Sequence, residues 1–166
     1  MAGRRCNRCP TLVDLFAYGT LMTAEGLRAA LGDRADTFRY RVARLPGWRR
    51  IWNVYREEWS GVVLNLERHP GAVVVGVLIE GLSFEDLSAL DSQESTHARA
   101  RVTVAPDAGA AAAAEVYWRA GAGHEGPPSD TYLLAVRARA RACGPAVLSN
   151  LLEGSVDSRG APLRLG

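Results

Sequence analysis

The chain has 166 residues, of which 48% are hydrophobic, and this suits one domain whose core needs no disulfide or metal for its stability. Its 20 basic residues, all arginine, nearly balance 18 acidic ones, so the net charge of +2 predicts no surface for nucleic acid. No apolar run approaches the roughly 20 residues that cross a bilayer, and we expect a cytoplasmic protein that binds no membrane.

Residues 1–10 are polar and end in a proline, which predicts an arm in front of the domain. Within it, Cys6 and Cys9 form a lone CxxC pair, either half of a zinc site, a redox pair or two free thiols. The sequence has no second CxxC and no histidine pair at zinc-finger spacing, and Cys143 alone leaves a metal site one ligand short. Free thiols in a reducing compartment are the favoured interpretation, and we expect no bound metal.

The apolar residues 12–18 predict a buried strand, which Gly19 ends in a turn with a backbone geometry that a side chain would forbid. Thr23 is placed to cap a helix over Ala24–Leu31. A sharp turn between a strand and a helix leaves backbone N–H groups unpaired, and these can hold a carboxylate or a polarised carbonyl oxygen. The turn is therefore either the floor of a small-molecule site or an ordinary loop whose Tyr18 packs in the core.

The remaining chain predicts a run of strands that is interrupted by one short helix. The expected strands cover residues 38–45, 48–55, 61–66, 72–81, 97–105 and 115–119. Turns are expected at Pro46-Gly47 and at His69-Pro70-Gly71, the second with the signature of a hairpin. These strands are too numerous and too closely spaced for the alternation of a parallel sheet.

Three further helices are expected. Ser83 opens the first with a capping box and it continues to about Leu90, while Ser129 caps the second, over residues 130–143. Gly144-Pro145 restarts a shorter helix to about residue 153. We predict a single α+β domain over residues 11–154, a small, mostly antiparallel or mixed β-barrel with flanking helices, followed by a loose tail over residues 155–166.

Five spaced segments carry the clearest functional signal. They are Tyr18-Gly19-Thr20-Leu21-Met22, Gly61-Val62-Val63-Leu64-Asn65-Leu66, Gly76-Val77-Leu78, Leu90-Asp91-Ser92-Gln93-Glu94 and Pro128-Ser129-Asp130-Thr131-Tyr132-Leu133. In this order and at these intervals they resemble the gamma-glutamylcyclotransferase-like family, over about residues 15–152.

The resemblance implies an enzyme without a cofactor that releases 5-oxoproline and an amine from a small gamma-glutamyl amide. It also implies roles for particular residues. The backbone amides of Tyr18, Gly19, Thr20 and Leu21 would hold the gamma-glutamyl group, and Glu94 would be the acid/base. Tyr132 would open a late helix near the site.

The residue types agree with this chemistry. An α-ammonium must lose a proton before its nitrogen attacks the γ-carbonyl, and the departing amine must gain one, so a single carboxylate can serve both steps. Glu94 follows a short helix where the sequence turns to strand, so it can point from a corner into a cavity. Desolvation there would raise its pKa from about 4.3 toward neutrality. The N–H groups of the turn can stabilise either the amide oxygen or the α-carboxylate.

Several residues keep a second interpretation. Glu94 taken alone fits a solvated charge at a helix end, and Tyr132 fits a core aromatic. Asn65 can reach the site or satisfy a strand end. The three histidines share no ligand spacing and are expected in turns or at the surface: His69, His97 and His124.

Two departures from the family pattern leave the leaving amine open. Ser95 follows Glu94 where glycine is common, and His97 stands near a position where tyrosine is often found. The alternative function is a non-catalytic module on the same fold that binds a small carboxylate or amine.

Overall fold

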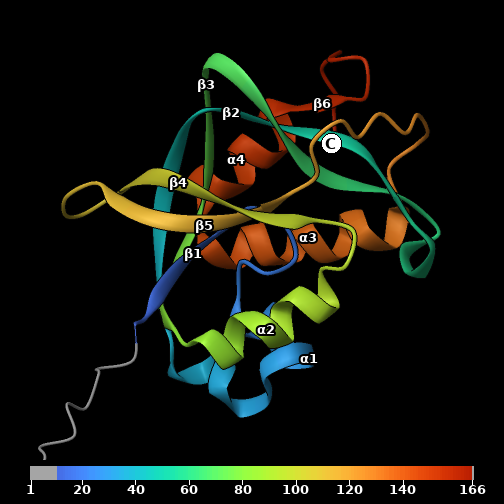
Figure 1. Ribbon diagram of the computed structural model, residues 1–166. Helices are drawn as coiled ribbons and strands as arrows, with labels where there is room; N and C mark the ends of the chain where they lie inside the picture. Colours follow the sequence, from blue (N-terminus) through green and yellow to red (C-terminus); the bar gives the residue numbers. More distant parts are fainter. Residues whose placement is uncertain (1–10, 166) are drawn as a thin grey trace, which may run out of the picture.

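Five strands of the computed structural model, which describes residues 11–165, close into a mixed barrel (Figure 1). They are β1 (Val13–Ala17), β2 (Arg39–Arg56), β3 (Gly61–Leu82), β4 (Ala98–Pro106) and β5 (Ala112–Trp118). The order is β3-β1-β5-β4-β2, and pairing of β2 with β3 closes the ring. Only β1 and β5 pair in parallel within it. The predicted α+β fold with a small mixed barrel is confirmed.

The two longest strands correct the predicted turns. β2 joins the two strands expected on either side of Pro46-Gly47, and β3 joins the two on either side of residues 69–71. Pro46 pairs with Val73 and Trp48 with Arg68, so the two irregular stretches lie opposite each other. The strands therefore bend together at a bulge and continue. The hairpin predicted at His69-Pro70-Gly71 is wrong, and the connection between β2 and β3 is instead the short 3₁₀ helix η2 (Glu57–Trp59).

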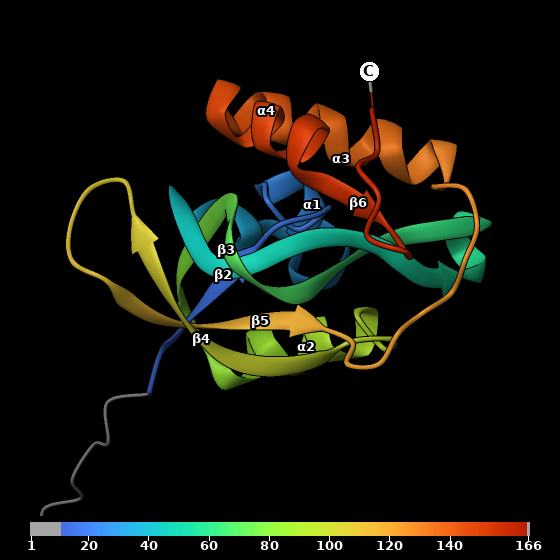
Figure 2. The same cartoon turned by 90° about the horizontal axis from the view of Figure 1, so that it is seen from above.

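Four α-helices flank the barrel. They are α1 (Ala24–Leu31), α2 (Phe84–Gln93), α3 (Asp130–Cys143) and α4 (Pro145–Gly154), with a 3₁₀ helix η1 (Gly32–Thr37) after α1. Helices α3 and α4 lie on one side of the barrel, and β4 and β5 form the opposite side (Figure 2). Helices α1 and α2 contact each other at one end (Figure 1). No helix within residues 11–165 is long and apolar enough to cross a membrane.

The predicted helix caps are present. The Thr23 hydroxyl accepts from the N–H of Gly26 at 3.4 Å, and Ser83 forms the expected capping box with Asp86. Helix α2 runs three residues past the predicted Leu90, because its last turn is completed by the N–H of Glu94 donating to the Leu90 carbonyl. Glu94 therefore stands at the C-terminal cap of α2, at the corner that leads to β4.

The C-terminal segment is ordered up to residue 165, so the expectation of a loose tail is wrong. Residues Ser155–Asp157 form β6, which pairs in parallel with Arg50–Trp52 of β2. β4 pairs with β2 only around Ala43 and Arg44, and this leaves the later part of β2 with an edge on which β6 adds. The predicted arm over residues 1–10, with Cys6 and Cys9, lies outside the described residues.

Close contact between β1 and β3 sets the position of the turn that follows β1. Leu15 and Phe16 are buried in the core of the barrel, and Phe16 pairs with Leu78. A Cβ at Gly76 of β3 would lie 2.4 Å from the carbonyl oxygen of Ala17 and 2.7 Å from the Phe16 ring. Only glycine allows β1 to lie this close, which brings the end of β1 and its turn to the mouth of the barrel.

Candidate active site

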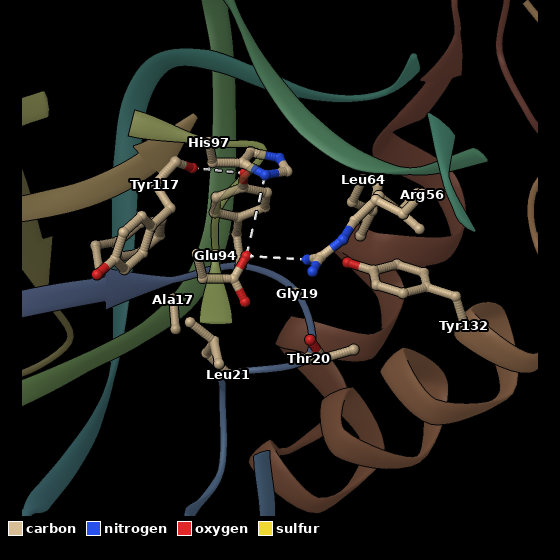
Figure 3. A pocket seen from close by; sticks show the side chains of 13 residues that line it. Ala17, Gly19, Thr20, Leu21, Arg56, Leu64, Glu94, His97, Tyr117 and Tyr132 are labelled. Atoms are coloured by element: carbon tan, nitrogen blue, oxygen red, sulfur yellow. Dashed lines mark hydrogen bonds and ion pairs between the residues drawn. The ribbon is translucent and has the colours of Figure 1, made fainter. Parts of the chain in front are cut away.

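A cavity opens at the end of β1, and its walls come from six parts of the chain (Figure 3). The space free of protein atoms is about 410 Å³, and this volume includes open solvent in front of the cavity. The lining residues are Phe16, Ala17, Tyr18, Gly19, Thr20 and Leu21 from β1 and its turn, Arg56 from β2, Val63 and Leu64 from β3, Glu94 and His97 from the α2–β4 corner, Tyr117 from β5 and Tyr132 from α3. All six residues predicted for the site lie here.

The turn after β1 presents backbone to the cavity. The N–H of Met22 donates to the Gly19 carbonyl at 3.3 Å and closes the turn. The N–H groups of Gly19, Thr20 and Leu21 donate no hydrogen bond to any of the residues 11–165. Such free donors in a turn between a strand and a helix are suited to an anion or a polarised oxygen.

Tyr18 contributes through its backbone, because its hydroxyl is used elsewhere. The Tyr18 hydroxyl donates to the Tyr117 carbonyl at 2.6 Å and is buried. Burial, aided by the negative charge of Glu94, raises the pKa of this hydroxyl well above its usual value. The Tyr18 side chain is therefore a fixed part of the cavity wall. Its hydroxyl stays protonated and does not donate a proton to a substrate.

Glycine is required at position 19 because a side chain there would have no room. Its φ lies outside the left-handed region, unlike that of several other described glycines, so the expected unusual backbone geometry is wrong. A Cβ at this position would instead lie 2.7 Å from the hydroxyl oxygen of Tyr132. Glycine therefore lets the helix-borne Tyr132 reach the turn, and the two predicted substrate-binding elements meet directly.

Tyr132 is held from three sides. It lies in the first turn of α3, where its N–H donates to the Ser129 hydroxyl at 3.2 Å. Its ring packs edge-on against Trp52 and Trp59, with centroids 5.7 and 5.2 Å away. Ser129 also donates to the Trp59 carbonyl at 2.6 Å, so the cap ties α3 to η2. The helix cap expected of Ser129 is confirmed, and burial together with the charge of Glu94 raises the pKa of the Tyr132 hydroxyl.

Glu94 carries the acidic group of the cavity. Its N–H donates to the Leu90 carbonyl at 2.8 Å and its carbonyl accepts from the N–H of His97 at 2.9 Å, which fixes the corner. Only 8% of the residue is exposed, so the alternative of a solvated charge does not hold. Burial raises the pKa of this carboxyl, and the positive charge of Arg56 opposes the rise.

Two side chains beside Glu94 were not predicted for the site. The Arg56 Nη1 lies 3.4 Å from Glu94 Oε2, and its Nη2 donates to the Gln93 carbonyl and pairs with Glu58. The sequence offered little signal for it, because the strand does not alternate before Arg56: residues 50–54 are all buried and Tyr55 is exposed. An arginine on the inward face of a strand needs a buried partner.

His97 is the second unpredicted neighbour, and its expected surface position is wrong. Its side chain is 4% exposed, and its Nδ1 lies 4.0 Å from Glu94 Oε2 and 2.9 Å from the Thr96 hydroxyl. Burial and the charge of Arg56 lower the pKa of His97 to about 4. The imidazole is therefore neutral near pH 7 and leaves the charge of the corner to Glu94 and Arg56.

The other candidates lie away from the cavity. Asn65 is fully buried, and its side chain holds both the N–H and the carbonyl of Arg119 at 2.9 Å. It therefore fixes the segment after β5 and takes no part in lining the cavity. His69 and His124 are exposed, as expected.

The family of the chain follows from comparison with known proteins. The sequence model of the family described as "Gamma-glutamyl cyclotransferase, AIG2-like" matches residues 15–134, and the chain belongs to this family. The family and the fold support a cyclotransferase-type role in general. No curated protein matches the chain.

Solved structures share the fold at low identity. A protein described as "Gamma-glutamyl cyclotransferase" is 22% identical, with a TM-score of 0.71 over 81% of both chains. An uncharacterized protein from Homo sapiens is 23% identical, with a TM-score of 0.69 over 80% of both chains. A yeast gamma-glutamyl cyclotransferase specific to glutathione is 13% identical, with a TM-score of 0.56 over 84% of this chain and 95% of that one.

Proposed function

We propose that this protein cyclises a gamma-glutamyl amide and releases 5-oxoproline and a free amine. The observation that carries the proposal is the buried carboxylate of Glu94, which lines the same cavity as the Gly19–Leu21 turn, whose N–H groups are free (Figure 3). The family of the chain supports the same reaction class.

Glu94 serves as base and then as acid. Its carboxylate takes a proton from the substrate's α-ammonium, and the freed nitrogen attacks the γ-carbonyl carbon. The new C–N bond closes a five-membered ring, and the γ-carbonyl π electrons move to the oxygen. When this tetrahedral intermediate collapses, the C=O double bond re-forms, the original amide C–N bond breaks and Glu94 returns the proton to the departing amine. The ring nitrogen, which still carries an extra proton, gives it to the amine, and the amine leaves as an ammonium ion. The sum is one substrate giving two products, with no water consumed.

The environment of Glu94 suits both steps. Burial raises the pKa of the carboxyl, which makes its ionised form a stronger base than an exposed glutamate. Arg56 opposes the rise, so that the ionised form is retained for the first step. His97 stays neutral beside them and adds no competing charge, because its pKa is lowered to about 4.

The Gly19–Leu21 turn holds the substrate in position. Ring closure is intramolecular, so much of the barrier is lowered by holding a bent chain with its nitrogen near the γ-carbon. The N–H groups of Gly19, Thr20 and Leu21 are fixed donors and need no reorganisation during the reaction. Tyr132 lies against Gly19 and forms the side of this cradle.

A panel of gamma-glutamyl amides with different leaving amines tests the reaction. Purified protein should release 5-oxoproline and amine in equal amounts from at least one of them. The matched chemical control is the same compound with its α-nitrogen acetylated, which has no nucleophile and should remain intact. Release of glutamate, or cleavage of the acetylated compound, would show hydrolysis and reject cyclisation.

The binding module on the same fold predicts a different result from the same panel. A gamma-glutamyl compound would raise the thermal midpoint of the protein without any product appearing. Glu94 argues against a module that binds only a carboxylate, because a buried carboxylate beside such a site costs stability without a gain in binding. A module that binds an amine could retain Glu94, and the absence of product from the panel would identify it.

A further inference from the structure

Arg50 lies directly behind the glycine turn and has an unusual set of partners. It belongs to β2 and is 1% exposed. Its Nε donates to the Tyr18 carbonyl at 2.9 Å, its Nη2 to the Val75 carbonyl at 2.7 Å and its Nη1 to Asn150 Oδ1 at 2.5 Å. All three acceptors are neutral, and no carboxylate of residues 11–165 pairs with Arg50. A buried cation without a counter-charge is costly.

The contact with Tyr18 links this charge to the cavity. The Tyr18 carbonyl and the Gly19 N–H belong to one peptide unit, which is trans like all peptide bonds of the described residues. In a trans unit the N–H points away from the carbonyl, so the Gly19 N–H points away from Arg50. Gly19 lines the cavity and Arg50 does not. The cation therefore lies on the side of this peptide opposite to its free N–H, and the residue that carries the N–H lines the cavity.

A cation on a carbonyl strengthens the donor at the other end of the same peptide. The guanidinium draws electron density toward the Tyr18 oxygen, and the Gly19 N–H becomes more positive. Burial lowers the pKa of Arg50 to about 10, so the group remains charged near pH 7. Holding three neutral acceptors does not require a full charge, since amides and hydroxyls can do so at less cost.

We propose that Arg50 is a positioning residue that supplies the positive charge for the free α-carboxylate of the gamma-glutamyl substrate, through the Tyr18–Gly19 peptide. The inference rests on the proposed function and assigns the carboxylate, rather than the γ-carbonyl oxygen, to the turn. The charge of Arg50 and the charge of the substrate's α-carboxylate are both present before and during ring closure. Their attraction therefore acts equally in the ground state and in the transition state. The substrate class is therefore gamma-glutamyl compounds whose α-carboxyl is neither amidated nor esterified.

The experiment compares the binding of two compounds that differ in one charge, the product 5-oxoproline and its carboxamide. Calorimetry gives the Kd of 5-oxoproline and of its neutral carboxamide for the wild type and for Arg50→Gln, Arg50→Lys and Asn150→Ala, each checked for folding by circular dichroism. Asn150→Ala is the matched control, because it removes a partner of Arg50 but keeps the cation and its bond to Tyr18. Steady-state kinetics on one gamma-glutamyl amide are measured in parallel.

The wild type should prefer the acid to the carboxamide. Arg50→Gln should reduce this preference on the order of 10-fold or more, the effect of a hydrogen bond that involves a charge. The loss should appear in KM more than in kcat. Arg50→Lys should keep part of the preference, because one ammonium cannot hold both carbonyls that the guanidinium fork reaches. Asn150→Ala should lose stability and keep the preference.

An unchanged preference in folded Arg50→Gln overturns the inference, while 5-oxoproline release by the wild type leaves the proposed function standing. If Arg50→Gln does not fold, the neutral variant Arg50→Met decides, because it removes the charge and keeps the length of the side chain. An unchanged preference in folded Arg50→Met rejects the role of Arg50, whereas an unchanged preference in Arg50→Lys supports it, because the cation is kept. A wild type that binds neither compound and releases no 5-oxoproline rejects both proposals.

Discussion

The two walls of the cavity are built on opposite principles. The Gly19–Leu21 turn offers backbone donors. Two groups beside it keep their protons near pH 7: Arg50, which donates to the Tyr18 carbonyl, and the Tyr132 hydroxyl, which lies against Gly19. The α2–β4 corner offers Glu94, whose pKa depends on its burial and on Arg56. We infer that the turn sets which compound binds at any ordinary pH, whereas the corner sets how fast and at which pH it reacts.

The largest expected effect comes from removing Glu94, the proposed proton carrier of the corner. Glu94→Gln keeps the shape of the side chain but cannot take the α-ammonium proton, and kcat should fall about 10²- to 10⁴-fold. Binding of 5-oxoproline at the turn should change little, which calorimetry checks. Glu85→Gln removes an exposed charge from the same helix and is the matched control. A kcat of Glu94→Gln near that of the control contradicts the assigned role.

Damage to the turn should give the next largest effect, and it should appear in binding. Gly19→Ala places a Cβ 2.7 Å from the Tyr132 hydroxyl oxygen, so the turn, the Tyr132 side chain or α3 must move. We expect 5-oxoproline affinity to fall roughly 10-fold and the thermal midpoint to fall by several degrees, consistent with the 1–3 kcal/mol of an overpacked contact.

The double variant Gly19→Ala/Tyr132→Phe sharpens this test. Without the hydroxyl, the nearest ring atom of residue 132 lies 3.9 Å from the new Cβ, an ordinary contact. Most of the lost stability should therefore return, as a positive coupling in a double-mutant cycle. Losses that simply add would show that Gly19 is required for another reason.

A smaller effect should distinguish the two charges that act on the pKa of Glu94, those of Arg56 and Glu58. The Arg56 charge lowers the pKa of Glu94 and the Glu58 charge raises it. In Arg56→Gln the acid limb of kcat/KM should therefore move to higher pH, and in Glu58→Gln to lower pH, with severalfold changes in rate on the acid side. The pH profile of kcat/KM measures both shifts. Shifts of the same sign in the two variants would contradict this account of the corner.

The smallest expected effect is on stability. Because burial raises the folded-state pKa of Glu94 above its unfolded value, the folded state holds more protons than the unfolded one between the two. The stability that the Glu94 carboxyl contributes is fully present below its pKa in the unfolded state, and it is lost as pH rises through its pKa in the folded state. At neutral pH, Glu94→Gln should therefore raise the thermal midpoint by about 2–4 °C, as differential scanning calorimetry would show. Glu85→Gln removes an acid from the first turn of the same helix and should not raise it. A lower midpoint for Glu94→Gln would show that the carboxylate stabilises the fold.

Local signals in the sequence predicted the parts that depend on neighbouring residues. Thr23, Ser83 and Ser129 cap helices that begin where expected, because a cap needs only the next three residues. The turn and Glu94 were found through spaced segments that resemble a known family. Pro46-Gly47 misled the prediction, because the residues opposite it on β3 are irregular as well and the paired strands continue.

The sequence by itself therefore determined the helices, the mixed α+β class, the glycine turn and its carboxylate partner. Tertiary structure alone decided that Gly19 is needed for the approach of Tyr132, that Arg56 and His97 surround Glu94, and that Arg50 supports the Tyr18–Gly19 peptide. The physical reason is sequence separation. Arg50 and Tyr18 are 32 positions apart, and Arg56 and Glu94 are 38 apart, so only closure of the barrel brings these charges to the groups that they affect.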